Sequence, residues 1–356
     1  MDILLDKDAA YIAIGAAARV ATSIGLQQQV KDLRLSPPEI SERYIVFWCL
    51  YSFDKTLSLR LGRPPAIDDR DTEIDIPDEK QLTLENPRSI TVLLSHMRLG
   101  RITSEVYSEL YSARSRKYPA IKRFRTISEL DRKLQDWCMS LPADIRPGSQ
   151  ISCSEGALRS VFTLHLEYYN CLATLHRCWA FQDPLAEYEE LRNDLAHRGC
   201  GDIGDRVYSG QLICLDAARS TADLLTVLGQ HGLQDSALIG LTLYHSLSAF
   251  IILFANILQN PGDSYVSKDV QLLSVIIDSL CPGLQASGAA LPNLAYELLE
   301  KMRSVAVEYV ARVHTNVKAA PKRPYEQTEG AVKRHPIRSA QDNHNQPPDY
   351  RHRVRW

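Results

Sequence analysis

The chain has 356 residues, of which 45% are hydrophobic and 24% are charged, and its formal net charge is −2. This balance supplies enough apolar side chains for a large core and lacks the overall basicity of a nucleic-acid-binding surface. None of the eight cysteines forms a pair at the two-residue spacing of a zinc site, and no signal peptide opens the sequence. We therefore expect a soluble intracellular protein with reduced, mostly buried thiols.

The first predicted helix begins at Asp8, which can cap it, and ends at Gly25. Its apolar positions recur every four residues, which predicts that one face of the helix is buried. These positions are Ile12, Ala16, Val20 and Ile24.

A long helix is predicted to follow Ser36. The segment Ser36-Pro37-Pro38-Glu39 has the pattern of a capping box, and Gly62 before Pro64-Pro65 ends the helix. Two apolar stripes predict that this helix is covered over most of its circumference. One stripe is Ile40, Tyr44, Phe47, Trp48 and Tyr51; the other is Val46, Leu50, Phe53, Leu57 and Leu61.

Asp54 interrupts the apolar surface of this helix. A buried carboxylate is costly unless it is paired, and we predict an ion pair with Arg63, whose guanidinium can hold a carboxylate through two parallel bonds. The pair would lock the chain reversal after Gly62. A catalytic Asp54 would need a second acid, base or metal ligand at a defined spacing, and the sequence supplies none there.

Three further helices are predicted from capping signals: one from Asn86-Pro87, one from Thr126 to about Leu141, and one from Ser152. A basic patch with two interleaved aromatics precedes Thr126. We interpret it as a solvated loop between helices, with phosphate contact as the alternative. Its basic residues are Arg114, Arg116, Lys117, Lys122, Arg123 and Arg125.

His165 and His176 lie on one face of the helix that follows Ser152, with Cys171 and Cys178 nearby. The two histidines are about 16 Å apart along a helix, which is too far for them to share one ion. We therefore interpret both as core histidines with hydrogen-bond partners rather than as metal ligands.

The remaining helices are predicted around residues 212–225, 236–259, 270–280 and 293–313, with a surface excursion over residues 182–206. The apolar run 247–258 is shorter than a membrane-spanning helix. From Ala319 the sequence is rich in proline, charge and amides, with eight basic against four acidic residues, so disorder is expected. The pairs Lys322-Arg323 and Lys333-Arg334 can serve nuclear import.

The second helix and its exit resemble the fungal-specific transcription factor domain, the middle regulatory region of fungal zinc-cluster transcription factors. The resemblance is carried by the spacing from Phe47-Trp48 through Asp54 to Gly62-Arg63-Pro64. Residues 17–26 and Leu164 to Arg177 also match, the latter through His176-Arg177. Gln27 stands where the family usually has His, and Cys178 where it often has Pro. The resemblance extends over about residues 9–260.

The helical spacing predicts an all-α fold without strands. Together with the resemblance, it predicts one multi-helix regulatory domain over residues 1–318, shorter at its N-terminus than the family, and a disordered basic tail over residues 319–356. Its expected role is regulation of transcription in the nucleus, without enzymatic activity or a cofactor. In the family a binuclear zinc cluster held by six cysteines reads DNA, and this chain lacks that module.

Expected partners are other transcription regulators or a second copy of the chain, together with a small-molecule effector. DNA is expected only through the missing module, and no membrane is expected. One alternative is a helical protein-interaction module, or a truncated regulator, with no direct DNA partner. Another is an enzyme that uses buried acids such as Asp54 and Asp68, for which the sequence offers no catalytic constellation.

Overall fold

The computed structural model describes residues 7–29, 35–84, 86–177, 203–230, 236–286 and 290–319. Within these ranges the regular structure is entirely helical, which confirms the predicted all-α class. The α-helices are α1 (Lys7–Ser23), α2 (Pro37–Leu61), α3 (Pro87–Val106), α4 (Ala120–Ser140), α5 (Glu155–Arg177), α7 (Ile203–Gln230), α8 (Ser236–Gln259), α9 (Val266–Ala286) and α10 (Ala290–Ala319). Residues 320–356, which form nearly all of the predicted disordered tail, lie outside the described ranges.

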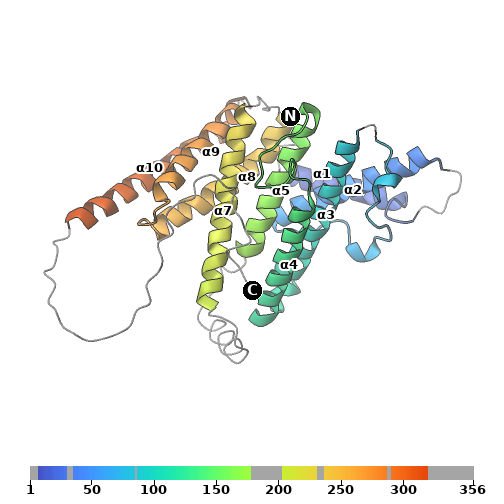
Figure 1. Cartoon of the computed structure of the whole chain (residues 1–356), viewed down its shortest axis with the longest axis horizontal. Coiled ribbons are helices and arrows are strands. Elements are labelled where there is room, and N and C mark those ends of the chain that lie inside the picture. Colours follow the sequence, from blue (N-terminus) through green and yellow to red (C-terminus); the bar gives the residue numbers. More distant parts are fainter. Residues whose placement is uncertain are drawn as a thin grey trace.

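The helices follow one another across the molecule, from α1–α3 at one end to α9 and α10 at the other (Figure 1). Three main apolar clusters hold them together. The first joins α1, α2 and α3, the second joins α3, α4 and α5, and the third joins α7, α8, α9 and α10. Because neighbours in sequence are mostly neighbours in space, each cluster is built from a nearly continuous part of the chain.

Both ends of α2 form as their sequence predicts. The Glu39 carboxylate accepts hydrogen bonds from the backbone N–H and the hydroxyl of Ser36, at 2.7 and 2.6 Å. At the other end, Gly62 has φ +64°, a left-handed conformation that glycine adopts without a steric penalty. The backbone N–H of Arg63 then donates to the Ser58 carbonyl at 3.0 Å, which closes the last turn.

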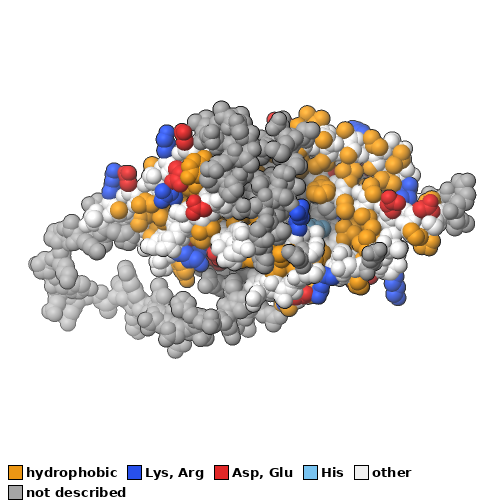
Figure 2. Space-filling model, turned by 90° about the horizontal axis from the view of Figure 1, so that it is seen from above, with side chains coloured by type: hydrophobic (Ala, Val, Ile, Leu, Met, Phe, Trp, Pro, Cys, Tyr) orange, Lys and Arg blue, Asp and Glu red, His pale blue; other side chains and the backbone are white. Residues whose placement is uncertain are grey.

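The predicted apolar stripe of α1 faces outward, so that prediction was wrong. Ile12, Val20 and Ile24 are 59–70% exposed, whereas Ala18 and Ala21 are buried against α2. Small alanine side chains let the two helices approach closely, so the opposite face of α1 is the one that packs. The second stripe of α2 is also partly exposed, with Val46 at 47% and Phe53 at 58%. Figure 2 shows hydrophobic side chains on the surface of this half of the molecule.

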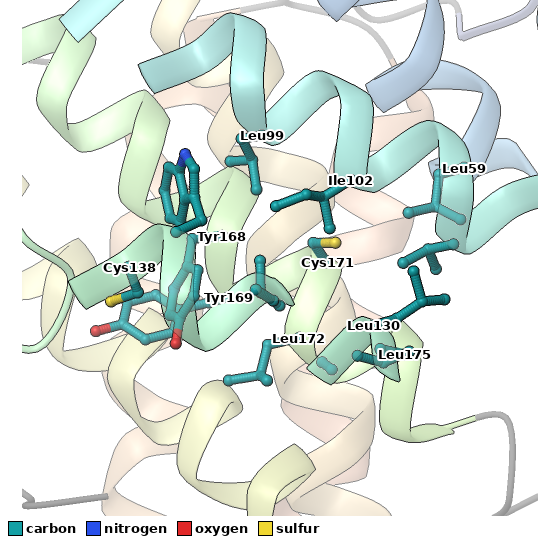
Figure 3. Packing of buried hydrophobic residues seen from close by; sticks show 14 of the residues in the cluster. Leu59, Leu99, Ile102, Leu130, Cys138, Tyr168, Tyr169, Cys171, Leu172 and Leu175 are labelled. Carbon is teal, nitrogen blue, oxygen red and sulfur yellow. The ribbon is translucent and has the colours of Figure 1, made fainter. Parts of the chain in front are cut away.

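The second cluster lies at the centre of the fold (Figure 3). Leu59 of α2 joins apolar side chains from α3, α4 and α5, and the Trp137 and Tyr168 rings stack with centroids 5.6 Å apart. The indole N–H of Trp137 donates to the Ser95 carbonyl at 3.1 Å, so this large side chain is also satisfied as a polar group. The side chains drawn and labelled in Figure 3 are Leu59, Leu99, Ile102, Leu130, Cys138, Tyr168, Tyr169, Cys171, Leu172 and Leu175.

The fourth helix begins earlier than predicted. Helix α4 starts at Ala120, directly after Pro119, and runs through Thr126 instead of starting there. Buried Phe124 and Ile127 are three residues apart on one face, which extends the helix in the N-terminal direction. The basic patch therefore continues into α4. Five of its cations are exposed, as a solvated segment requires, but Arg123 is 5% exposed and belongs to the core.

Helix α8 contains a longer apolar stretch than the predicted run of residues 247–258. The 18 residues Thr242–Gln259 are long and apolar enough to cross a membrane by length and composition. Phe250, Leu253 and Ile257 of this stretch are 0% exposed and pack in the cluster with α7 and α9. This burial is typical of the core helix of a globular domain, which passes the same test of length and composition.

The contact between α2 and α3 predicts opposite effects for two glycine-to-alanine changes. A Cβ on Gly100 would lie 3.0 Å from Ser52 Oγ and 3.4 Å from Ser52 Cα, whereas one on Gly15 would meet nothing within 4 Å. We expect Gly100→Ala to lower the free energy of unfolding by about 1–3 kcal/mol through overpacking. Gly15→Ala should raise it by about 0.5–1 kcal/mol through helix propensity.

Urea denaturation of the two variants beside the wild-type chain measures both effects. A Gly100→Ala variant as stable as Gly15→Ala would show that α2 and α3 are not in close contact at this point.

Candidate functional site: a cavity between α5, α7 and α8

The aromatic residues of the family-like motif form the core of α2. Phe47, Trp48 and Tyr51 are 0% exposed, and their ring centroids lie 4.9–6.2 Å apart. The Arg101 guanidinium of α3 lies over the Trp48 ring at 5.2 Å, a cation–π contact between the two helices. These residues therefore have a packing role.

The predicted ion pair between Asp54 and Arg63 is wrong. The Asp54 carboxylate, 2% exposed, accepts the backbone N–H groups of Ala66 and Ile67 at 2.9 and 3.0 Å. Arg63 instead lies 2.7 Å from the Asp8 carboxylate at the surface. The chain passes Asp54 so closely that two backbone donors reach its carboxylate directly, whereas the first turn of α1 supplies an exposed acid for Arg63. Asp54 still holds the chain reversal, but through the backbone.

The exit from α2 is also tied to α1 through Pro64. The hydroxyl of Tyr11 donates to the Pro64 carbonyl at 2.6 Å, and the Arg63 guanidinium lies 5.3 Å from the Tyr11 ring. The predicted turn Gly62-Arg63-Pro64 thus connects the C-terminal end of α2 to α1.

A half-buried carboxylate–cation contact lies beside Asp54, and sequence reasoning missed it. Lys55, 2% exposed, lies 3.1 Å from the Asp69 carboxylate and also donates to the Ile67 carbonyl. The hydroxyls of Tyr51 and Ser104 donate to Asp69 at 2.7 and 2.6 Å. Asp69 therefore links α2 to α3, and the acidic run after Ile67 was the only sequence signal for it.

Burial and hydrogen bonding act in opposite directions on these two acids. Burial raises the pKa of Asp54, although the Ala66 and Ile67 backbone donors favour its charged form. Burial also disfavours the charged form of Asp69, but Lys55 and the two hydroxyls outweigh it and lower the pKa of Asp69. We call Tyr51, Asp54, Lys55, Asp69 and Ser104 the α2 exit network.

The corrected contacts predict unequal and additive effects at Asp54 and Arg63. Asp54→Ala leaves two backbone N–H groups without their acceptor and should cost roughly 3 kcal/mol of unfolding free energy. Arg63→Ala removes an exposed ion pair and should cost below about 1 kcal/mol. A double-mutant cycle in urea measures both, with a coupling energy near zero expected; strong coupling would show that the two side chains meet.

The two predicted core histidines have protein partners. His165 Nε2 lies 2.9 Å from the Ile145 carbonyl, and His176 Nε2 lies 3.1 Å from the Asp131 carboxylate of α4. Both rings are at most 4% exposed. Burial lowers the pKa of His165 to about 4, so this ring is neutral at pH 7. The partners support the core interpretation of both residues.

His176 and Arg177, at the end of α5, also line a cavity of about 600 Å³. Leu212 and Leu215 of α7 and Ile251 of α8 supply much of its apolar surface. Polar side chains are placed among them: Gln211, Ser248, Asn256, Gln259, Asn260 and Asp263. A concave, largely apolar surface with a few polar groups is the usual form of a small-molecule site.

The polar edge of the cavity is held by buried charges. Asp269, 0% exposed, receives two hydrogen bonds from Arg219 at 2.7 and 2.8 Å and one from the Asn256 amide at 3.3 Å. The Asn260 amide in turn donates to Asn256 Oδ1 at 2.9 Å. The charged pair thus lies behind the cavity wall. The amides of Asn256 and Asn260 line the cavity in front of it, together with the charged side chains of Asp263 and Arg177.

Cys214 is the one thiol of the cavity wall among the described residues. It is 8% exposed, and its Sγ donates to the Ala173 carbonyl at 3.4 Å. Burial raises the pKa of Cys214 to about 12, so it is a neutral thiol at pH 7. Because the thiolate is the reactive form, this geometry favours non-covalent binding over chemistry at sulfur.

Residues 3–139 match the sequence model of the fungal specific transcription factor domain. Residues 3–139 thus carry a fungal specific transcription factor domain. The match includes α1–α3, the α2 exit network and nearly all of α4, and it ends before the cavity. The segment Leu164 to Arg177, which the sequence analysis also compared with the family, lies outside the residues that the family model matches.

Several proteins that are similar to this chain are named as transcription regulators. The chain is 36% identical to an ABC-transporter-regulating transcription factor of Aspergillus fumigatus over 280 residues, 76% of this chain and 31% of the relative. The like-named protein of Aspergillus oryzae is 35% identical over the same shares. An uncharacterized transcriptional regulatory protein of Schizosaccharomyces pombe is 27% identical over 307 residues, 84% of this chain and 38% of the relative.

The chain spans about a third of the length of these curated relatives. No solved structure matches it.

Proposed function

We propose that this chain is the regulatory, non-DNA-reading part of a fungal zinc-cluster-type transcription regulator that acts in the nucleus. The observation that carries the proposal is the transcription factor domain over residues 3–139, together with relatives over three quarters of the chain that are named as transcription factors. Regulators of this kind bind partners and do not catalyse reactions, so we propose no enzymatic role and no cofactor for this chain.

The regulatory unit of the proposal is residues 1–318. DNA reading is assigned, by the family resemblance, to a zinc-cluster module with six cysteines, and the eight cysteines of this sequence lack the paired spacing of such a cluster. The basic pairs Lys322-Arg323 and Lys333-Arg334 are the proposed nuclear import signals. They lie outside the described residues.

The cavity supports a small-molecule effector as the input of this regulator. Its walls come from α5, α7 and α8, which also form the central and the third apolar clusters. A ligand changes the state of a protein only through contacts that differ between two states. A molecule that bridges these three helices would make such contacts, because it would favour one arrangement of the packed clusters over another.

A reporter assay tests this function. The full chain is fused to a heterologous DNA-binding module in a fungal host. We expect the fusion to change transcription from the matching promoter relative to the module alone. Ile251→Trp, which fills the cavity at a side chain that is 56% exposed, should alter the effect at equal protein level.

Leu298→Trp is the matched control for the reporter assay, because Leu298 is 57% exposed on α10 and belongs neither to the cavity wall nor to the exposed apolar surface of α1 and α2. It should behave like the unchanged fusion. A fusion with the same reporter output as the DNA-binding module alone would contradict the regulatory role. Equal effects of the two tryptophan variants would contradict the role of the cavity.

Exposed apolar side chains on α1, directly after it and on α2 favour a second candidate, a helical module that binds another regulator or a second copy of the chain. Ile12, Val20, Ile24, Val46 and Phe53 are all at least 47% exposed. Apolar surface of this kind, when contiguous, marks interaction sites. Association through this surface is compatible both with a transcription regulator and with a protein-interaction module that has no DNA partner.

Light scattering coupled to size-exclusion chromatography tests self-association. We expect the apparent mass of the chain to rise with concentration, and Phe53→Glu to reduce that rise because it places a charge on an apolar surface. A monodisperse monomer over the whole concentration range would rule out self-association as the use of this surface.

A further inference from the structure

A buried histidine of α8 has a polar atom without a partner. His245 is 2% exposed, and its Nε2 makes no hydrogen bond in the described part of the structure. A buried polar atom in this condition is unfavourable, because it has lost its hydrogen bonds to water without gaining another. Burial, together with the nearby Arg60 guanidinium, lowers the pKa of His245 well below its usual value, so the ring is neutral at pH 7.

His245 lines a small inner cavity of about 10 Å³ between α5, α7 and α8. This volume is about the size of one water molecule or one ligand oxygen. Asn170 of α5 and Ser248 of α8 lie in the same wall, so an oxygen atom placed there meets several polar groups. Thr221 of α7 also lines it, but its hydroxyl already donates to the Ala217 carbonyl at 2.9 Å.

The inner cavity is next to the 600 Å³ cavity. Ser248 and Ile252 belong to the walls of both. His245, Ser248 and Ile252 are spaced by three and four residues along α8, and Asn256 and Gln259 continue the same face toward the polar edge of the larger cavity. One face of one helix therefore leads from the larger cavity to His245, the residue with the unpartnered nitrogen.

We propose that the effector of this regulator is an apolar molecule that carries a hydroxyl group, with its body in the larger cavity and its oxygen bound by His245 Nε2. The proposal rests on the effector role of the cavity set out above and names the chemical class of the ligand. The hydroxyl reaches past Ser248, and the apolar body contacts Ile251, Ile252 and Leu215.

The geometry selects a hydroxyl over charged groups. The inner cavity accommodates one oxygen atom, whereas a carboxylate brings two. A cationic group is disfavoured by the charge of Arg60 in α2, which already helps to lower the pKa of His245. A hydroxyl both donates and accepts, so it satisfies Nε2 in either tautomer of the ring.

Two probes of nearly equal shape test this proposal. We would measure the binding of 2-naphthol and of 2-methylnaphthalene to the full chain by isothermal titration calorimetry. The hydroxyl should give 2-naphthol an affinity about tenfold higher, because it supplies the missing hydrogen bond of a buried group. In His245→Leu the two probes should bind within about twofold of each other, with 2-methylnaphthalene little changed.

The outcomes separate the two proposals. Equal affinities of the probes for the wild-type chain, or a preference for 2-naphthol that persists in His245→Leu, would overturn the histidine contact and leave the effector cavity standing. Absence of binding by either probe would overturn the effector cavity and the histidine contact with it.

A second measurement does not depend on how well the variant folds. The ¹⁵N resonances of the His245 ring in the wild-type chain should shift when 2-naphthol is added and should not do so with 2-methylnaphthalene. Ring resonances that respond equally to both probes, or to neither while the probes bind, would contradict the assignment of the hydroxyl to Nε2.

Discussion

The arrangement of the first three helices depends on how the buried carboxylate of Asp54 binds the chain after α2. Two backbone N–H groups, of Ala66 and Ile67, donate to it, and this fixes the direction of the chain after Gly62. Asp69 is thereby placed where Lys55, Tyr51 and Ser104 reach it from α2 and α3. Without this reversal, Asp69 would not join those two helices.

Buried polar contacts of the same kind recur at later helix junctions. His96 of α3 lies 2.9 Å from Glu167 of α5, His176 of α5 contacts Asp131 of α4, and Arg219 of α7 binds Asp269 of α9. Apolar packing alone tolerates small shifts between helices, whereas displacing one partner of a buried hydrogen-bonded pair leaves a polar group unsatisfied, at a cost of about 1–3 kcal/mol. These contacts therefore restrict the register of neighbouring helices, and the proposed effector cavity lies among them.

The sequence predicted the helices well where local rules decide their limits. The capping residues Ser36 and Asn86 and the stop at Gly62 act within a few residues, and each is found as predicted. Helix faces were less predictable, because the choice between Ile12–Ile24 and Ala18–Ala21 as the buried side of α1 depends on which surface α2 offers. A short-range signal does not contain that information.

The candidate site was largely invisible in the sequence for the same reason. His176 and Arg177 were singled out, but their cavity is completed by side chains of α7 and α8, far along the chain. The partner of Asp54 was wrongly predicted because charge pairing was preferred over backbone donors, whose positions depend on the path of residues 63–67. His245 gave no signal, since an unpartnered nitrogen is a property of its neighbours in space.

Hydrogen exchange of the Ala66 and Ile67 amides tests most directly whether Asp54 organises the exit from α2. If their N–H groups are held by a buried carboxylate, these two amides should exchange as slowly as the core of α5, although they lie in a segment without regular structure. Rapid exchange of both, at the rate of exposed loop amides, would contradict the account.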